Sequence, residues 1–546
     1  MYLDKNLYVA HSSNGPIYLT GKMCNRHGLI AGATGTGKTV TLQVMAETFS
    51  QAGVPCFMAD MKGDLSGISQ TGRMSGFIEK RCKEFGLENP DFQPCPVRFF
   101  DVFGEQGFPM RSTITSMGPQ LLSRLMDLNE TQAGVLNIVF KIASDQNLRL
   151  DDLKDLRLML DFVGKNASKF TTQYGNVTAA SVGAIQRSIL ALEAEGGDKF
   201  FGENAFDVND LMDTQDGKGV MSVLAADKLM LNPKLYSTFL MWLMTELYAQ
   251  LPEVGDLELP KLVFFFDEAH MLFDGTSKAL VDKLEQVIRL IRSKGVGIYF
   301  ITQSPTDIPD TILSQLSNRV QHALRAFTPK DQKDVRAAAQ TFRVNPEFKT
   351  EDAIMNLETG EALVSFLDEK GAPGIVQRAR ILFPLSQIGA ITEGQRLDIN
   401  NAAPARIKAY KEVIDGESAY EVLTEVNAKT EAAENEAREA KEQAKAQKEA
   451  EKAQREAERE AARKEREASK KASGWKKTIL GSIIMAIVSA IARCFGSSVG
   501  KAVTGGSSSS KSKTSGGNDI LGKAARSATQ TATRKISEEV LKSIFK

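Results

Sequence analysis

The sequence has few of the residues that build disulfide frameworks and metal centres. Its 546 residues include five cysteines and four histidines, and the cysteines form no Cys-x-x-Cys pair. This pattern excludes a disulfide scaffold and argues against a zinc site, so we expect reduced cysteines, most of them in the core. The histidines do not pair at ligand spacing, and we predict no structural metal; they are His11, His27, His270 and His322.

Long apolar runs are also scarce. No apolar segment follows a basic start near the N-terminus, so we expect no signal peptide and a cytoplasmic protein. The apolar stretch 479–492 is shorter than the roughly 20 residues that cross a bilayer. Its large side chains gather on one side of a helical wheel, and Lys476, Lys477 and Arg493 flank it. A helix of this kind can bind a partner protein or an anionic lipid surface. We therefore predict that the tail binds one or the other, which includes peripheral association with a membrane.

Neither charge is in excess over the whole chain, because 68 Lys or Arg balance 68 Asp or Glu. The distribution is nevertheless uneven. Residues 470–546 contain fourteen Lys or Arg and three acidic residues, so the rest of the chain is acidic by the same excess. Outside that tail, a polyanion such as DNA would therefore have to bind a local basic lining.

What the sequence does contain, up to about Pro384, is an alternation of short apolar runs and helical patterns. This alternation predicts an α/β fold with a mostly parallel sheet. Helical periodicity between the second and third predicted strands indicates an all-helical insertion over about 110–215. The predicted strands are 27–31, 55–60, 219–224, 262–267, 297–302, 320–325, 362–366 and 375–381.

Beyond residue 386 the composition changes. We expect a helical extension over 387–427, followed over 428–473 by a long charged helix that contains no Leu, Ile or Val. A coiled coil is the alternative, but its seam would hold only alanines, which favours a solvated single helix or a weak pair. Residues 474–546 form a basic tail that includes the 479–492 helix and a Gly/Ser-rich linker over 505–517.

A complete phosphate-binding loop follows the first predicted strand and precedes a helix-compatible segment. Its glycines let backbone amides face a bound phosphate, and the helix N-terminus adds positive potential. Lys38 is expected to contact the β- and γ-phosphates, and the Thr39 hydroxyl to coordinate Mg²⁺. The motif predicts that the chain binds ATP and Mg²⁺. The alternative is a Gly-rich turn that binds no ligand. Its residues are Gly32, Ala33, Thr34, Gly35, Thr36, Gly37, Lys38 and Thr39.

Two further predicted strands end in polar residues. The apolar strand 262–267 leads to Asp267 and Glu268, which suits a Mg²⁺ ligand and a group that polarises the attacking water. A helix N-cap is the alternative for such an acidic pair. The strand 297–302 leads to Gln303, which is placed to bind the γ-phosphate or the lytic water, or instead to satisfy loop backbone groups.

Together with Asp60-Met61-Lys62-Gly63-Asp64 after the second strand, these motifs resemble the HerA–FtsK superfamily of ring-forming, DNA-pumping ATPases. Over residues from about 14 to 421 the chain is most similar to the YjgR-like bacterial branch of HerA-like helicases. The resemblance implies a RecA-like P-loop NTPase core over residues 1–386, a hexamer, and nucleotides bound between subunits. HerA carries a β-barrel ahead of its ATPase; Gly32 comes too early for one here, so we expect the charged helix and tail to supply assembly contacts.

The resemblance also implies that arginines complete the site. In ring ATPases a neighbouring subunit's arginine stabilises the charge of the transition state. Similarity to HerA points to Arg26 as this residue, supplied across the interface, and to Arg292 as one that acts within its own subunit. Arg319 and Arg325 are rivals, and arginines near helix ends are often surface charges.

Three functions compete. The leading one is an ATP-hydrolysing ring motor on double-stranded DNA, a substrate that rests on the resemblance alone. The second is a membrane-associated, ATP-dependent switch or assembly scaffold, motivated by the basic flanks of the 479–492 helix. The third is a small-molecule kinase, which Glu268 beside Asp267 and the length of the chain disfavour.

Overall fold

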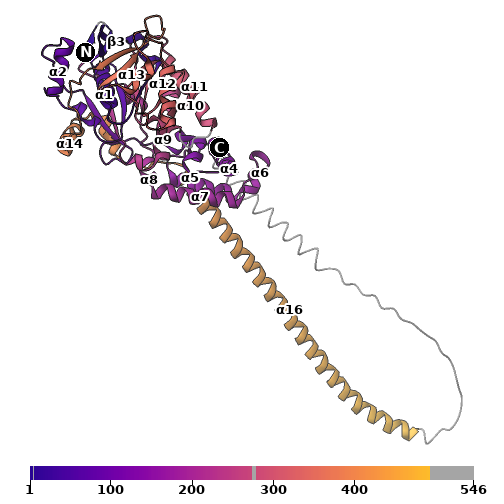
Figure 1. Ribbon diagram of the computed structural model, residues 1–546. Helices are drawn as coiled ribbons and strands as arrows, with labels where there is room; N and C mark the ends of the chain where they lie inside the picture. The colour runs from indigo at the N-terminus through magenta and orange to yellow at the C-terminus, as the bar shows by residue number, and fades with distance from the viewer. Residues whose placement is uncertain (4, 274–277, 492–546) are drawn as a thin grey trace. The chain divides into compact units, whose positions relative to one another are not determined.

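The computed structural model describes residues 1–3, 5–273 and 278–491 of the chain (Figure 1). The chain divides into two compact units, Met1–Val422 and Leu423–Lys546. The predicted Gly/Ser linker over 505–517 and the remainder of the tail from residue 492 lie outside the described residues.

Parallel strands form the centre of the main sheet. Among the described residues, thirteen strands join this sheet. The two-residue edge strand β7 (Phe108–Pro109) and its seven longer neighbours run parallel, which confirms the predicted fold class. In sheet order the seven longer strands are β13 (Asn318–Gln321), β4 (Gly28–Ala31), β12 (Val296–Thr302), β11 (Leu262–Phe266), β5 (Cys56–Asp60), β10 (Met221–Ala225) and β6 (Val97–Asp101).

Antiparallel strands extend the sheet beyond β13. They are β14 (Glu361–Ser365), β15 (Gln377–Ile381), β2 (Asn6–Ser12), β1 (Tyr2–Leu3) and β3 (Gly15–Thr20). The sequence did not predict β1, β2, β3 or β6. In β6 the cause is Arg98, a buried charge that interrupts the apolar run and pairs with Asp213. The short strands β7 (Phe108–Pro109), β8 (Thr214–Gln215) and β9 (Lys218–Gly219) complete the inventory.

Helices cover the apolar strands. On one face, Phe49 of α1 (Lys38–Gln51) packs against Phe265 and Tyr299. Alternate residues such as Phe264 and Phe300 point to the other face, where α10 (Lys278–Ile291) contacts β12 and α9 (Pro233–Gln250). The remaining helices around the sheet are α2 (Gly76–Phe85), α11 (Asp310–Leu313), α12 (Pro329–Gln340) and α13 (Thr350–Met355).

Helices alone make up the described chain between β7 and the turn before β8. Asn129 and Asp152 begin two of them with capping boxes, in which side chain and backbone satisfy each other's polar groups. The group packs onto α9 through its first helix, which also contacts the second. Its members are α3 (Ile114–Leu125), α4 (Glu130–Asp145), α5 (Leu153–Lys165), α6 (Ala167–Tyr174), α7 (Ala179–Ala194) and α8 (Gly197–Phe200).

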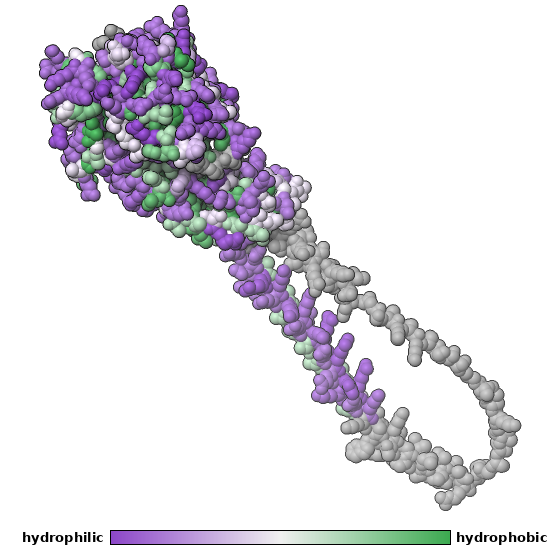
Figure 2. Space-filling view, in the orientation of Figure 1, coloured by the Kyte–Doolittle hydropathy of each residue, from purple (hydrophilic) through white to green (hydrophobic). Residues whose placement is uncertain are grey.

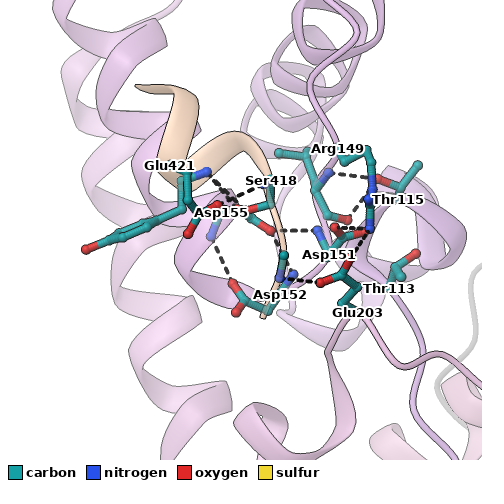
Figure 3. Close-up of polar contacts among 12 residues, drawn as sticks. Thr113, Thr115, Arg149, Asp151, Asp152, Asp155, Glu203, Ser418 and Glu421 are labelled. Atoms are coloured by element: carbon teal, nitrogen blue, oxygen red, sulfur yellow. Dashed lines mark hydrogen bonds and ion pairs between the residues drawn. The ribbon is translucent and has the colours of Figure 1, made fainter. Parts of the chain in front are cut away.

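The extension after the sheet carries α14 (Glu393–Ala402) and α15 (Ala405–Lys408) and ends against the helical group. Figure 3 shows its end, where Ser418 Oγ donates to Asp155 Oδ1 at 2.5 Å and Ser418 N donates to Glu421 at 2.8 Å. The Gly416 amide donates to Glu203 at 2.5 Å. These residues cap the start of α16 (Ala419–Ile491), so the acidic cluster in Figure 3 has a structural role.

The second unit, within the described residues, consists of the continuation of α16 to Ile491. Residues 438–470 are all exposed, and Figure 2 shows a hydrophilic surface along this helix. Helix pairing into a coiled coil stays a prediction. A search of the described helices finds none whose length and apolarity would let it cross a bilayer.

Candidate active site

The carboxyl ends of neighbouring parallel strands place the predicted site residues at one edge of the sheet. Ala31 of β4 pairs with Thr302 of β12, and Phe300 of β12 pairs with Phe266 of β11. The phosphate-binding loop, Gln303 and the Asp267-Glu268 pair therefore leave three adjacent strands at nearly one level. With strands about 4.8 Å apart, the loop and the acidic pair are separated by roughly 10 Å, which leaves room for phosphates.

The loop Gly32–Lys38 is tied to the strands on both sides of β4. The amide of Gly32 donates to Thr302 O at 3.2 Å, and the amide of Ala33 donates to Ala323 O at 2.8 Å. Gly32 has no room for a side chain, because a Cβ there would lie 2.5 Å from the Cβ of His322. Gly37 begins α1 with φ of 113°, a left-handed conformation that favours glycine.

Lys38 folds back over its own loop. Its Nζ donates to the carbonyl oxygens of Gly32 at 2.6 Å and Ala33 at 3.2 Å. Burial lowers the pKa of Lys38, and the charges of Asp267 and Glu268 act in the opposite direction. The ammonium group is thus positioned between the loop and the acidic pair, where a phosphate could replace the two carbonyl partners.

His322 supports the loop from behind, a role that the sequence did not reveal. It is fully buried, its Nδ1 lies 2.9 Å from Glu361 O, and its Nε2 lies 2.8 Å from the Thr41 hydroxyl. Because a carbonyl only accepts, Nδ1 carries the proton and Thr41 donates to Nε2. Burial lowers the pKa of His322 to about 4, so the ring is neutral. The position of His322 directly after β13 was the one feature of the sequence that could have indicated this role.

Asp267 and Glu268 differ in environment. Burial raises the pKa of Asp267 to about 6, with a further contribution from Glu268. Glu268 has φ of 48°, which is strained for a residue with a side chain. Its Oε1 lies 4.0 Å from Lys62 Nζ, and its Oε2 lies 3.5 Å from His270 Nδ1. That Oε2 is buried without a hydrogen-bond partner, so Glu268 can accept a proton or a water at the site.

Oxygen donors of the kind that Mg²⁺ prefers meet at this edge. Asp267 supplies a carboxylate and Thr39, in the first turn of α1, a hydroxyl. Neither thiol nor imidazole belongs to this pair, so the donor set fits a hard cation bound together with phosphates. Thr39 and Asp267 are the residues that would hold the ion, whose charge would offset that of the phosphates.

Gln303 is exposed at the end of β12 and lines a cavity of about 410 Å³. Ala33 of the loop, His270 and Arg325 line the same cavity. Arg325 Nη1 donates to Met355 O at 2.9 Å. The cavity therefore opens beside the loop, and Gln303 and Arg325 face the space next to the expected phosphates.

Arg26 and Arg292 lie at the opposite edge of the sheet. Arg26 precedes β4, and Arg292 precedes β12, whose seven residues separate its ends by about 20 Å. Both charges lower the pKa of the buried His27, which places them near one another. This placement argues against the prediction that Arg292 acts within its own subunit. Arg26 cannot reach its own loop either, so any catalytic contact must be to a neighbouring chain.

Arg319, one of the rival arginines, has a structural role. Its guanidinium donates to Leu316 O and Leu313 O, both at 3.0 Å, and to Thr341 O at 3.4 Å. These bonds use three of the five N–H donors and hold the guanidinium against backbone carbonyls. Of the two alternative arginines, Arg325 is the one that lines the cavity beside the loop.

Comparisons with known proteins agree with these motifs. The model of the family described as "Helicase HerA-like C-terminal" matches residues 5–545. The DNA double-strand break repair helicase HerA of Sulfolobus acidocaldarius is 30% identical over 99 residues, which is 18% of this chain and 19% of that protein. The chain thus matches about a fifth of that relative's length.

Two solved structures are among those to which the chain is similar. The bacterial conjugative coupling protein TrwB matches with 14% identity and a TM-score of 0.47, over 72% of this chain and 92% of that one. VirB4 of Thermoanaerobacter pseudethanolicus matches with 14% identity and a TM-score of 0.44, over 70% of this chain and 97% of that one.

Proposed function

The chain belongs to the helicase HerA-like C-terminal family and is a P-loop ATPase, and we propose that it works as a ring motor that moves double-stranded DNA. One observation carries the proposal: Lys38 of the phosphate-binding loop lies near the acidic pair Asp267 and Glu268 at one edge of the sheet. The relative named as a DNA repair helicase supports DNA as the substrate.

The chain's residues suggest how hydrolysis proceeds. Lys38 exchanges its two carbonyl partners for phosphate oxygens, and Gln303 orients the water from the neighbouring strand. Glu268 accepts a proton as the water oxygen bonds to the γ-phosphorus. The bond to the bridging oxygen breaks, ADP keeps that electron pair, and the proton passes to the released phosphate. Mg²⁺, held by Thr39 and Asp267, would neutralise charge on the phosphates.

A ring explains why basic residues lie far from the loop. In a head-to-tail ring, the edge that carries Arg26 and Arg292 faces the nucleotide edge of the next chain. Arg26 has a side chain that is 32% exposed, and its contact with Asp256 is long, at 4.0 Å. It is therefore available to a neighbour. We expect a hexamer, with both arginines supplied in trans.

The proposal is tested by ATP turnover of the purified chain with and without duplex DNA at low salt. A motor on DNA predicts stimulation by duplex of roughly tenfold or more, because translocation couples product release to the polymer. Equal turnover with and without duplex, at every salt concentration, contradicts DNA as the substrate while leaving the ATPase intact.

A second candidate is a membrane-associated ATP-dependent switch. It is favoured by the basic residues Lys476, Lys477 and Arg493 around the apolar segment 479–492. Flotation of the full chain and of a chain ending at residue 473 on anionic liposomes separates the candidates. The switch predicts flotation of the full chain alone; equal behaviour of both chains rules out the tail as the anchor.

A further inference from the structure

Lys62 is a second lysine at the nucleotide edge, beyond the lysine of the phosphate-binding loop. It follows β5, which pairs with β11 so that Met58 lies beside Phe265. Asp60 therefore lies level with Asp267, and Lys62 lies two residues farther toward the site. The side chain of Asp60 accepts from the amide of Leu65 at 3.2 Å, which closes the turn that carries Lys62.

The charge of Lys62 reaches the groups of the active site. Its Nζ lies 4.0 Å from Glu268 Oε1. It lowers the pKa of Asp267, with an influence greater than that of Lys38, and it also lowers the pKa of Lys38. Within the described residues, the ion pair of Lys62 is with Glu268.

The contact between Lys62 and Glu268 is suited to exchange. The Lys62 side chain is 54% exposed, whereas that of Glu268 is 14% exposed. A long, partly exposed ion pair contributes little stability, so a phosphate with greater charge can displace the carboxylate. Glu268 is meanwhile held in a strained backbone conformation, and its buried Oε2 has no hydrogen-bond partner although His270 Nδ1 lies 3.5 Å away.

We propose that Lys62 binds the γ-phosphate within its own subunit, releasing Glu268 as it does so. Without nucleotide, Lys62 pairs with Glu268. With a triphosphate in the loop, Lys62 turns to the terminal phosphate, and the freed Glu268 carboxylate orients the attacking water. ADP has no γ-phosphate and leaves the pair in place. This proposal rests on the ATPase activity and is independent of DNA as the substrate.

The first test compares two nucleotides. Affinities for ADP and for a non-hydrolysable ATP analogue, each with Mg²⁺, are measured for the parent, Lys62→Ala, Lys62→Arg and the control Lys83→Ala. We expect Lys62→Ala to lower the affinity for the ATP analogue by about tenfold, because a charge-assisted contact to the γ-phosphate is lost. The affinity for ADP should fall by less than about twofold. Lys62→Arg should retain analogue binding, and Lys83, an exposed residue of α2, should have no effect.

The outcomes are distinguishable. Equal weakening of both nucleotides by Lys62→Ala, or no weakening of either, overturns the role in γ-phosphate binding. A parent chain that binds neither nucleotide overturns the ATPase assignment along with it.

A second test needs no variant. The parent is acetylated with a lysine reagent, and modification of Lys62 and Lys83 is quantified by mass spectrometry. We expect the ATP analogue to protect Lys62 by severalfold, and ADP and the free state to leave it reactive. Protection by ADP as strong as by the analogue, or protection by neither, contradicts the exchange.

Discussion

The two edges of the parallel sheet differ in what their polar side chains contact. At the amino edge, His27 is buried, its Nε2 lies 2.7 Å from Ile288 O, and its Nδ1 accepts from the Ile298 amide at 3.0 Å. Asn318 Nδ2 donates to Met23 O at 2.9 Å, and Tyr299 OH donates to Cys24 O at 3.0 Å. The side chains of His27, Asn318 and Tyr299 thus bond within the fold, whereas Asn25 Oδ1 and Arg26 Nε at the same edge are buried without a hydrogen-bond partner.

At the carboxyl edge, Asp60 Oδ1 and Glu268 Oε2 are buried without a hydrogen-bond partner. Glu268 also has a positive φ, and Lys38 donates only to its own loop. An unpartnered buried polar group costs free energy, so its presence requires compensation elsewhere. The amino edge is therefore bonded mainly within the fold, whereas the carboxyl edge gathers charged groups that a ligand can contact.

The largest effect that separates the edges is expected from Glu268→Gln. The amide keeps the shape but cannot accept the proton, so turnover should fall by roughly a thousandfold with nucleotide affinity retained. Steady-state phosphate release measures the turnover, and binding of a non-hydrolysable ATP analogue measures the nucleotide affinity. Glu258→Gln, which alters an exposed pair with Lys5, is the control. Retained turnover in Glu268→Gln would place the base elsewhere.

Arg26→Ala is expected to follow, with a loss of roughly a hundredfold in turnover if the arginine acts across a subunit interface. Mixing Arg26→Ala with Lys38→Ala chains should restore part of the activity, because some interfaces then combine an intact loop with an intact arginine. Turnover of the mixture measured against each variant alone decides this. Absence of any recovery would remove Arg26 from the neighbouring site.

Smaller effects are expected when two glycines are replaced by alanine, one at the start of β4 and one in the phosphate-binding loop that follows it. A Cβ at Gly28, at the amino edge, would overlap the ring of Tyr299 and lie 2.8 Å from Asn318 O. Gly28→Ala should therefore destabilise the fold by about 3 kcal/mol. Gly35→Ala in the loop meets no neighbour within 4 Å, though its φ is 76°, and should cost about 1 kcal/mol.

Denaturant unfolding and nucleotide binding together measure this difference. Gly35→Ala should impair nucleotide binding more than Gly28→Ala does, once both are compared under conditions where they are folded. A reversed order of the two stabilities contradicts the assignment of the amino edge as the structural one.

The smallest effect is a pH dependence from buried histidines. Burial lowers the pKa of His322 to about 4, whereas the unfolded chain has the ordinary value of 6.5. Below pH 6.5 the unfolded state binds a proton that the folded state excludes, so stability is lost as pH falls toward 4. Between pH 8 and pH 5 one such histidine accounts for about 2 kcal/mol.

His322→Gln should remove part of this acid dependence, which unfolding free energies at pH 8, 6.5 and 5 measure. His27 should contribute similarly, because burial also lowers its pKa to about 4. An unchanged difference between pH 8 and pH 5 in His322→Gln would show that the ring is not held neutral.

The sequence predicted what local chemistry encodes. Strands such as 262–266 are apolar throughout because both faces are covered, and the loop Gly32–Thr39 has a spacing that few other functions require. The positions of Asp267, Glu268 and Gln303 after their strands followed from the shared edge of parallel strands. Seven predicted strands agree with the observed bounds to within two residues, whereas the strand predicted over 320–325 is observed as Asn318–Gln321.

The sequence could not supply the order of the strands. The position of Arg292 at the far edge, by contrast, follows from its place before its strand and disfavours the predicted role within its own subunit. Lys62 stands beside Glu268 only because β5 is the neighbour of β11, a pairing between segments 200 residues apart that no local pattern records. The role of His322 depends on Thr41 and Glu361 in the same way.

The central claim is that the loop and the acidic pair form one nucleotide-hydrolysing site, and ATP turnover of Lys38→Ala beside the parent and Lys83→Ala tests it most directly. The parent and Lys83→Ala should hydrolyse ATP at equal rates, whereas Lys38→Ala, folded to the same extent, should lose turnover by roughly a hundredfold or more. Equal turnover in all three would contradict it.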